Sequence, residues 1–297
     1  MTTNPMSTNP ISTTRLVVTT AGPVEITRTD GDRPAVLFFP GGHCRSWTDC
    51  GQGVYTALGH EVVSFSRPGY GRTQVGSMDA AAFADVVREV CEQLGVLAPA
   101  AAVGVSFGGL QAVHVAGHRS IGVERLVLHS SAPSTLPYPD SRVEALLGPV
   151  AFSPALEPAV WWLVRWLVRS DRGLRAMLVR LSTLSPGQWW DDLSAAEKDQ
   201  ARRVFNGMGS GSGFVNDLRQ ARAKDAGQRR AALARVSSPA LITASPHDGG
   251  VDYAHAEDFR AHLENSRLVE PPSPTHLFWI GPGHDLVTDA VRHFLDD

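Results

Sequence analysis

The segment Gly104-Val105-Ser106-Phe107-Gly108 constrains the fold more than any other part of this chain, because it reads G-x-S-x-G directly after an apolar run. In this pattern a strand passes into a helix through one tight turn, and the serine lies at the tip of the turn. Glycine is needed on both sides, since a Cβ there would collide with the turn or hold the helix away from the strand. The pattern therefore predicts an exposed Ser106 hydroxyl beside the positive end of a helix at 110–118.

The flanking sequence favours this interpretation over a chance occurrence of the motif in a glycine-rich chain. Residues 81–95 carry apolar side chains at helical spacing and end on Gly95, a typical helix terminator. Pro99 interrupts the chain before the motif, and residues 123–129 form a further apolar run after it. Strand, turn, helix and strand make a βαβ unit, which a serine turn of this kind requires.

Composition restricts the class of protein. A chain of 297 residues holds one α/β domain with an insertion or two small domains, and 43% hydrophobic with 19% charged residues is ordinary for a globular protein. The formal net charge is −3 and no region is strongly basic, which argues against a nucleic-acid partner. No run is apolar enough to span a membrane, so membrane association is not expected.

The cysteines and the N-terminal segment indicate the compartment. Cys44, Cys50 and Cys91 cannot all pair and lack the spacing of a zinc site, which favours a reducing environment and predicts no metal. Residues 1–14 are rich in Thr, Ser, Asn and Pro without an apolar segment, which predicts a disordered tail rather than a signal peptide. We therefore expect a cytoplasmic protein; the sequence does not indicate an oligomeric state.

Apolar patterning predicts an α/β architecture. Strands are expected at 15–20, 24–29, 34–39, 61–65, 123–129, 240–244 and 266–270, and helices at 47–58, 81–95, 110–118, 254–263 and 286–295, with a helix pair at 160–181. Between 133 and 236 the sequence shows helices and loops without a convincing strand. The simplest arrangement is a core of residues 15–132 and 237–297, in which helices flank a mostly parallel sheet, with residues 133–236 as a helical insertion.

A serine hydroxyl becomes a nucleophile at neutral pH only with a base, and the base needs an orienting carboxylate. Asp248 follows the predicted strand 240–244 directly, where such an acid is expected. The alternative interpretation is that Asp248 serves only to form a turn, since Asp-Gly is a common turn pair. Asp252 lies further from the strand end and Asp258 lies within a helical pattern, so both are weaker alternatives.

Two histidines follow the final predicted strand and compete for the role of base. His284 is preceded by glycine, a combination that often carries this role. His276 lies nearer the strand end at Glu270 and leaves residues 277–283 to lead back to the last helix. The pattern favours His276 and leaves His284 as the runner-up.

An oxyanion hole requires two backbone N–H donors. One is expected from Phe107, and the other from the loop after the strand 34–39, where Gly41 and Gly42 allow the backbone close to a substrate. The Gly42 N–H is favoured over that of His43. The His43 side chain has two equal interpretations, as a pocket residue and as a loop residue that bonds to the backbone.

From about residue 15 to residue 295 the chain resembles the α/β-hydrolase superfamily. Residues 66–73 (S-R-P-G-Y-G-R-T) are similar to the D-R-P-G-x-G-x-S loop of that family, with Ser66 in place of the acid. Pro40-Gly41-Gly42 stands where the family usually has His-Gly-x, and Ser245 stands where it has glycine. The resemblance implies a mostly parallel eight-stranded sheet flanked by helices, with residues 133–236 as an inserted cap over the active site.

The resemblance also implies a catalytic triad of Ser106, Asp248 and His276. The intervals from Asp248 and from Arg267 to His276 resemble those of the family, whereas the interval to His284 is too long. Serine at the elbow argues against the epoxide hydrolases and haloalkane dehalogenases of the same fold, in which aspartate takes that place.

These residues predict a serine hydrolase that cleaves a carboxylic ester of a small or medium, apolar substrate through an acyl-enzyme, without a cofactor. Trp161 and Trp162 are candidate pocket walls in the cap, although packing of the cap onto the sheet would also explain either one. Hydrolysis of a carbon–carbon bond, of an amide or at a peptide end could use the same triad. A ligand-binding protein on a retained hydrolase fold is a further alternative.

Overall fold

An eight-stranded sheet forms the centre of the molecule, in the order β1-β2-β4-β3-β5-β6-β7-β8. The computed structural model describes residues 11–139, 150–153 and 155–297. The strands are β1 (Ser12–Thr19), β2 (Gly22–Thr29), β3 (Arg33–Phe39), β4 (His60–Phe65), β5 (Ala101–Val105), β6 (Leu126–His129), β7 (Ala240–Thr243) and β8 (Ser266–Val269). The β1–β2 and β2–β4 pairs are antiparallel and the other pairs are parallel. The mostly parallel eight-stranded sheet is therefore confirmed.

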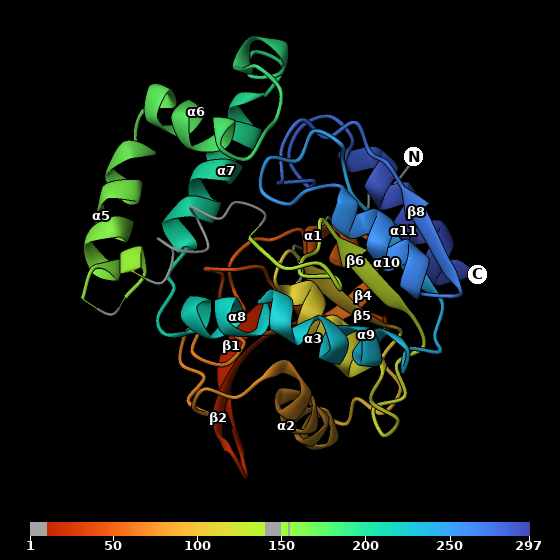
Figure 1. Cartoon of the computed structure of the whole chain (residues 1–297). Coiled ribbons are helices and arrows are strands. Elements are labelled where there is room, and N and C mark those ends of the chain that lie inside the picture. The colour runs from red at the N-terminus through yellow and green to blue at the C-terminus, as the bar shows by residue number, and fades with distance from the viewer. Residues whose placement is uncertain (1–10, 140–149, 154) are drawn as a thin grey trace, which may run out of the picture.

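Helices connect the strands and flank the sheet (Figure 1). Five belong to the core: α1 (Gly53–Ala57), α2 (Ala80–Leu94), α3 (Gly108–Ala116), α10 (Ala254–His262) and α11 (His284–Asp296). Between β6 and β7 lie α5 (Glu157–Leu167), α6 (Asp171–Val179), α7 (Ala195–Gly207), α8 (Gly213–Gln220) and α9 (Ala226–Leu233), with 3₁₀ turns at Pro186–Gln188 and Ala223–Asp225. We call this stretch between β6 and β7 the helical insertion.

The central strands are apolar along their whole length because both faces of the sheet are covered. In β3 the side chains alternate: Val36 and Phe38 join a cluster with α1 and α11, whereas Leu37 and Phe39 join a cluster with α2, α3 and α10. The first cluster is contiguous and extends beyond the sheet to apolar side chains of α5, α6 and α7.

The helices of the insertion lie in two groups. Figure 1 shows α5, α6 and α7 gathered away from the sheet, whereas α8 and α9 lie close to α3. Among the described residues of the insertion, the one β pairing is an isolated bridge between Ser182 and Asp248. The insertion thus reaches the loop after β7, where the acid candidate lies.

The turn at Ser106 has the close packing that the sequence predicts. Ser106 has a positive φ of 51°, a strained conformation for a residue with a side chain. A Cβ at Gly108 would overlap the carbonyl oxygen of Phe39, and one at Gly104 would overlap the backbone of Gly109. The expected collision on both sides of the serine is therefore confirmed, and it brings α3 directly against β3 and β5.

Several predicted boundaries differ from the structure. β1 begins at Ser12, so residues 12–14 of the predicted tail belong to a strand, while residues 1–10 lie outside the described part of the chain. The first residues of β1 are exposed at a sheet edge, where polar Ser and Thr are tolerated and no apolar signal is needed. β6 begins at Leu126 rather than at residue 123, and α3 begins at Gly108 rather than at residue 110. α11 begins at His284 rather than at residue 286.

Three further observations concern the cysteines, membrane-spanning helices and metal sites. Cys44, Cys50 and Cys91 are all buried free thiols. In the described part of the chain, no helix combines the length and apolarity that crossing a membrane requires. Within the same residues, no cluster of His, Cys, Asp and Glu side chains has the form of a metal site.

We expect Gly108→Ala to lower the free energy of unfolding by about 3 kcal/mol, because the added methyl overlaps the Phe39 carbonyl and pushes α3 away from β3. The matched control is Gly227→Ala in α9, where no atom lies within 4 Å of the added Cβ. The control should stabilise the protein by about 0.5–1 kcal/mol. Urea denaturation measures both effects, and equal losses of stability would contradict the packing argument.

Candidate active site

The predicted site residues follow strands β3, β5, β7 and β8. Ser106 comes directly after β5, Asp248 lies in the loop after β7, and His276 lies in the loop after β8. Gly41 and Gly42 follow β3, which is hydrogen-bonded to β5. Because these strands are parallel, their carboxyl ends share one edge of the sheet, and the loops gather there.

Asp248 and His276 are hydrogen-bonded to each other. The His276 Nδ1–H donates to Asp248 Oδ2 at 2.7 Å, and the Asp248 side chain has only 2% of its surface exposed. The other oxygen, Oδ1, accepts from the backbone N–H groups of Gly250 at 2.7 Å and Val251 at 3.0 Å. Both oxygens are engaged, so the carboxylate is fixed and holds the imidazole with Nε2 free to act as a base.

The environment of His276 favours its protonated form. Burial of the ring opposes protonation, but the negative charge of Asp248 and the hydrogen bond to it outweigh that effect and raise the pKa of His276. A buried imidazole beside a carboxylate is the arrangement that stabilises the imidazolium formed when a histidine takes a proton.

A segment of the insertion holds these two loops together. The Leu181 carbonyl accepts from the N–H of Gly249 at 3.1 Å and from the N–H of His276 at 2.8 Å. The contact is close: a Cβ at Gly249 would lie 2.5 Å from the Ser182 nitrogen. One carbonyl after α6 therefore ties the acid loop to the histidine loop.

Ser245 adds a second link between the same loops. Its hydroxyl donates to the Ser273 carbonyl in the histidine loop at 2.6 Å and accepts from the His247 N–H at 3.1 Å. The family's glycine at this position would lack both bonds.

Ser106 lies at the base of the site and is only 8% exposed. The prediction of an exposed hydroxyl is therefore wrong, because the loop after β3 packs against the serine. Its own N–H donates to the His129 carbonyl at 3.1 Å, and its carbonyl accepts from the N–H groups of Gly109 and Ala132. No hydrogen bond of its hydroxyl to His276 or to any other described group is present. In structures without substrate such contacts are often longer than in the reacting complex.

The loop after β3 lies against the serine. A Cβ at Gly41 would be 3.1 Å from Ser106 Cβ, and a Cβ at Gly42 would be 3.1 Å from the Phe107 ring, so any larger residue would force its neighbour to shift by a few tenths of an ångström. Neither the Gly42 N–H nor the Phe107 N–H donates to another group among the described residues. Both amides are free to bind an anionic oxygen.

Arg67 fixes the orientation of this loop. Its Nε donates to the Pro40 carbonyl at 3.1 Å and its Nη2 donates to the Gly41 carbonyl at 3.0 Å. In a planar trans peptide the C=O and N–H point in opposite directions. By holding the Gly41 carbonyl, Arg67 therefore aims the Gly42 N–H of the same peptide unit the other way.

Arg67 is itself held by helix α8. Its Nη1 is paired with Asp217 Oδ1, and the Tyr70 hydroxyl donates to Asp217 Oδ2 at 2.6 Å. Both charged side chains are buried. Burial alone would lower the pKa of Arg67, but the charge of Asp217 outweighs it and raises that pKa above the ordinary value. The insertion thus supports the loop after β3 as well as the loops of Asp248 and His276.

Aromatic side chains surround His43 next to this loop. The His43 ring lies 3.9 Å from the Phe214 ring, 4.4 Å from Phe152 and 5.1 Å from Trp161, measured between centroids. Its Nδ1 is 2.7 Å from the Ser210 hydroxyl, which also accepts from the Trp161 Nε1–H. Burial, and then Arg67, lower the pKa of His43 to about 3, so the ring is neutral.

The tryptophans predicted as pocket walls have different positions. Trp161 is 4% exposed and packs behind His43, whereas Trp162 is 67% exposed. On helix α5 adjacent residues point about 100° apart, so only one of the two faces the core. The structure therefore gives no support to Trp162 as a pocket wall.

The alternative acids and base lie elsewhere. His284 opens α11, and its backbone N–H donates to the Gly281 carbonyl. Asp252 accepts from the Ala254 N–H at the start of α10, and Asp258 accepts from Thr135. Of the two candidate bases, His276 is the one whose side chain bonds to Asp248.

Sequence reasoning did not identify Arg67, Asp217, Phe214 or Leu181. Arg67 lies in the segment that carried the family resemblance, which was a usable signal. The other three belong to the insertion, where no motif marks them and only the folded chain brings them to the site.

Comparison with known sequences gives the family. The profile described as the alpha/beta hydrolase fold matches residues 34–282. The uncharacterized hydrolase YcgS of Bacillus subtilis (strain 168) is 32% identical over 266 residues, which cover 84% of this chain and 87% of that protein.

Solved structures share the fold. An alpha/beta hydrolase fold protein from Nakamurella multipartita has a TM-score of 0.72 at 22% identity, covering 95% of this chain and 99% of that one. The enol-lactonase from Burkholderia xenovorans LB400 has a TM-score of 0.70 at 18% identity, covering 95% of this chain and 100% of that one. A thermophilic esterase from Thermogutta terrifontis has a TM-score of 0.67 at 20% identity, covering 96% and 98%. With the profile match over most of its length, the chain belongs to the α/β-hydrolase family.

Proposed function

We propose that this α/β hydrolase cleaves carboxylic esters of small or medium, apolar acids through a covalent acyl-enzyme on Ser106. The observation that carries the proposal is the 2.7 Å bond between His276 Nδ1 and the buried Asp248, in loops that gather at the same sheet edge as Ser106. Solved structures of the same fold include proteins described as esterases, from Thermogutta terrifontis and Exiguobacterium antarcticum.

The proposed reaction has two half-reactions. The Ser106 Oγ forms a bond to the ester carbonyl carbon while its proton passes to His276 Nε2, and the N–H groups of Gly42 and Phe107 bind the resulting oxyanion. As the intermediate collapses, the bond to the alkoxy oxygen breaks and His276 gives its proton to the leaving alcohol. Water then attacks the acyl-enzyme, with His276 again as the base, and releases the acid and free Ser106.

The preference for an apolar acyl group rests on the aromatic side chains beside Gly42. Phe107, Phe214 and His43 lie next to the proposed oxyanion donors, and the His43 ring is neutral. An apolar group placed there loses contact with water and gains contact with these rings. We propose that the described helices of the insertion form the cap over this site, since α8 carries Phe214 and α5 carries Trp161.

Ser106→Ala and His276→Ala should each lower kcat/KM for a p-nitrophenyl ester by about 10⁴-fold or more, because each removes the nucleophile or its base. A fluorophosphonate probe should label Ser106 in the wild type and neither variant. Mass spectrometry of the labelled peptide identifies the site.

The matched control is His284→Ala, which should keep nearly all activity because His284 does not contact Asp248. Loss of labelling in this control with retention in His276→Ala would reverse the assignment of the base. A well-folded wild type that neither takes the probe nor hydrolyses esters would contradict the enzyme proposal in favour of a ligand-binding protein.

The pH profile should show an acid limb above 6.5, the ordinary pKa of histidine, because Asp248 raises the pKa of His276. Activity falls as the pH drops through this pKa, since protonated His276 cannot accept the serine proton. In Asp248→Asn the His276 ring stays buried but the negative charge beside it is lost, so the pKa of His276 should fall. The acid limb of the residual activity should therefore move below pH 6.5. The measurement is kcat/KM from pH 4 to 9 with a fluorogenic ester, and an unchanged limb would contradict the pairing.

Arg67→Lys should lower kcat by about 10–100-fold with little change in KM, because lysine lacks the fork that holds two carbonyls and Asp217 together. Arg72→Lys in the same loop is the control and should leave kcat unchanged, since Arg72 pairs with Glu25 instead. Thermal melting shows that both variants fold. A folded Arg67→Lys variant with normal kcat would exclude a role for Arg67 in positioning the Gly42 N–H.

A further inference from the structure

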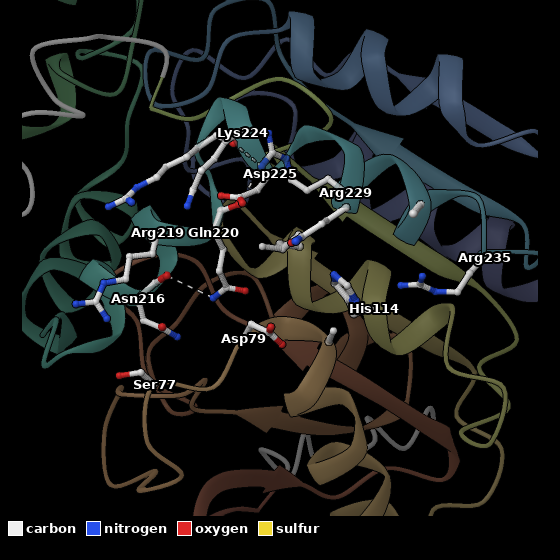
Figure 2. Close-up of a pocket in the computed structure, with 15 residues that line it drawn as sticks. Ser77, Asp79, His114, Asn216, Arg219, Gln220, Lys224, Asp225, Arg229 and Arg235 are labelled. Atoms are coloured by element: carbon white, nitrogen blue, oxygen red, sulfur yellow. Dashed lines mark hydrogen bonds between the residues drawn. The ribbon is translucent and has the colours of Figure 1, made fainter.

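A cavity lies outside the candidate active site, between α2, α3, α8 and α9 (Figure 2). Its volume is about 630 Å³, which suits a small molecule. None of Ser106, Asp248 and His276 lines it. The cavity is therefore a separate place on the molecule, with its own lining and its own chemistry.

Positive charge dominates this lining. The basic residues are Arg219, Arg222, Lys224, Arg229 and Arg235, against the carboxylates of Asp79 and Asp225. The whole chain has a formal net charge of −3, so this excess of cations is local. Among the described residues, none of the five basic side chains forms an ion pair. Asp79 is engaged as the N-cap of α2, where it accepts from the Ala82 N–H.

Arg229 is a buried cation in the wall of the cavity. It is 3% exposed and donates to backbone carbonyls on both sides, including Ser134 at 2.6 Å and Gln220 at 2.9 Å. Carbonyl dipoles stabilise a guanidinium without neutralising it. The carboxylates of Asp225 and Asp258 act on this guanidinium and oppose its charge. The exposed Arg219, Arg222, Lys224 and Arg235 therefore supply the positive potential of the cavity, while the bonds of Arg229 fix the wall between α8 and α9.

Two of the exposed cations, Arg219 and Arg235, lie at opposite ends of the cavity. Figure 2 shows Arg235 beside His114 at one end and Arg219 at the other, with Gln220 between them. Burial and Arg235 lower the pKa of His114 to about 4, so its ring is a neutral donor and acceptor. Amides of Asn216, Gln220 and Gln228 complete a lining that offers many hydrogen-bond donors.

We propose that this cavity binds a small, non-aromatic polyanion of the phosphate class, such as a diphosphate or an aliphatic phosphate ester. Guanidinium groups bind phosphate oxygens in pairs of charge-assisted hydrogen bonds, and cations at both ends suit a ligand with more than one anionic group. The lining contains His114 but no Phe, Tyr or Trp, so it lacks the platform on which a nucleobase usually stacks. This binding site is independent of the proposed ester hydrolysis.

The test uses inorganic pyrophosphate as the probe, titrated by calorimetry into the full-length Ser106→Ala protein. Ser106→Ala excludes any contribution from turnover. Pyrophosphate should bind with one site per chain, and Arg219→Gln and Arg235→Gln should each weaken binding by about tenfold. Arg230→Gln is the matched control, because Arg230 is exposed on α9 and does not line the cavity.

A second readout places the ligand. Pyrophosphate should shift the NMR signal of the His114 ring, which is identified by its loss in a His114→Gln variant. Citrate serves as the carboxylate comparison and should bind more weakly than pyrophosphate. The proposal is overturned if the Ser106→Ala protein with an otherwise unchanged cavity does not bind pyrophosphate, or if citrate binds more tightly than pyrophosphate. It is also overturned if Arg230→Gln weakens binding as much as Arg219→Gln.

Discussion

The close packing of the turn at Ser106 is the constraint on which the rest of the structure depends. Gly104 and Gly108 leave no space for a Cβ, because the backbone of Gly109 and the Phe39 carbonyl occupy those positions. α3 therefore begins immediately after the serine, against β3 and β5, and Ser106 keeps a positive φ of 51°. Since the loop after β3 meets the same turn, Ser106 and the proposed oxyanion donors Gly42 and Phe107 are positioned together.

The insertion contributes to the site from two sides. On one side the Leu181 carbonyl ties the loops of Asp248 and His276, and on the other Asp217 of α8 holds Arg67 against the loop after β3. These contacts are backbone hydrogen bonds and a buried ion pair, which are strong only while water is excluded. The same helix α8 also lines the cavity between α2, α3, α8 and α9 through Asn216 and Gln220, so it lies between that cavity and the candidate active site.

Local signals explain what the sequence predicted well. The turn at 104–108 contains the glycines that its close packing requires. The continuous apolar runs of the central strands indicate a sheet that is covered on both faces. The position of Asp248 after β7 and the interval to His276 were readable because both residues belong to loops that leave adjacent strands. The edge strand β1 was placed a few residues late, since its exposed start carries no apolar pattern.

By itself the sequence determined the fold family and the serine turn, because glycine sterics and strand periodicity act between residues close in the chain. For the partner of Asp248 the residue pattern left both His276 and His284 open, and the family resemblance favoured His276. Only the tertiary structure decided that Trp161 is buried while Trp162 is exposed, that Arg67 aims the Gly42 N–H, and that Leu181 joins two loops. Those outcomes depend on contacts between residues far apart in the chain, such as the ion pair of Arg67 with Asp217. Such contacts are set by how the helices pack, and no local pattern records them.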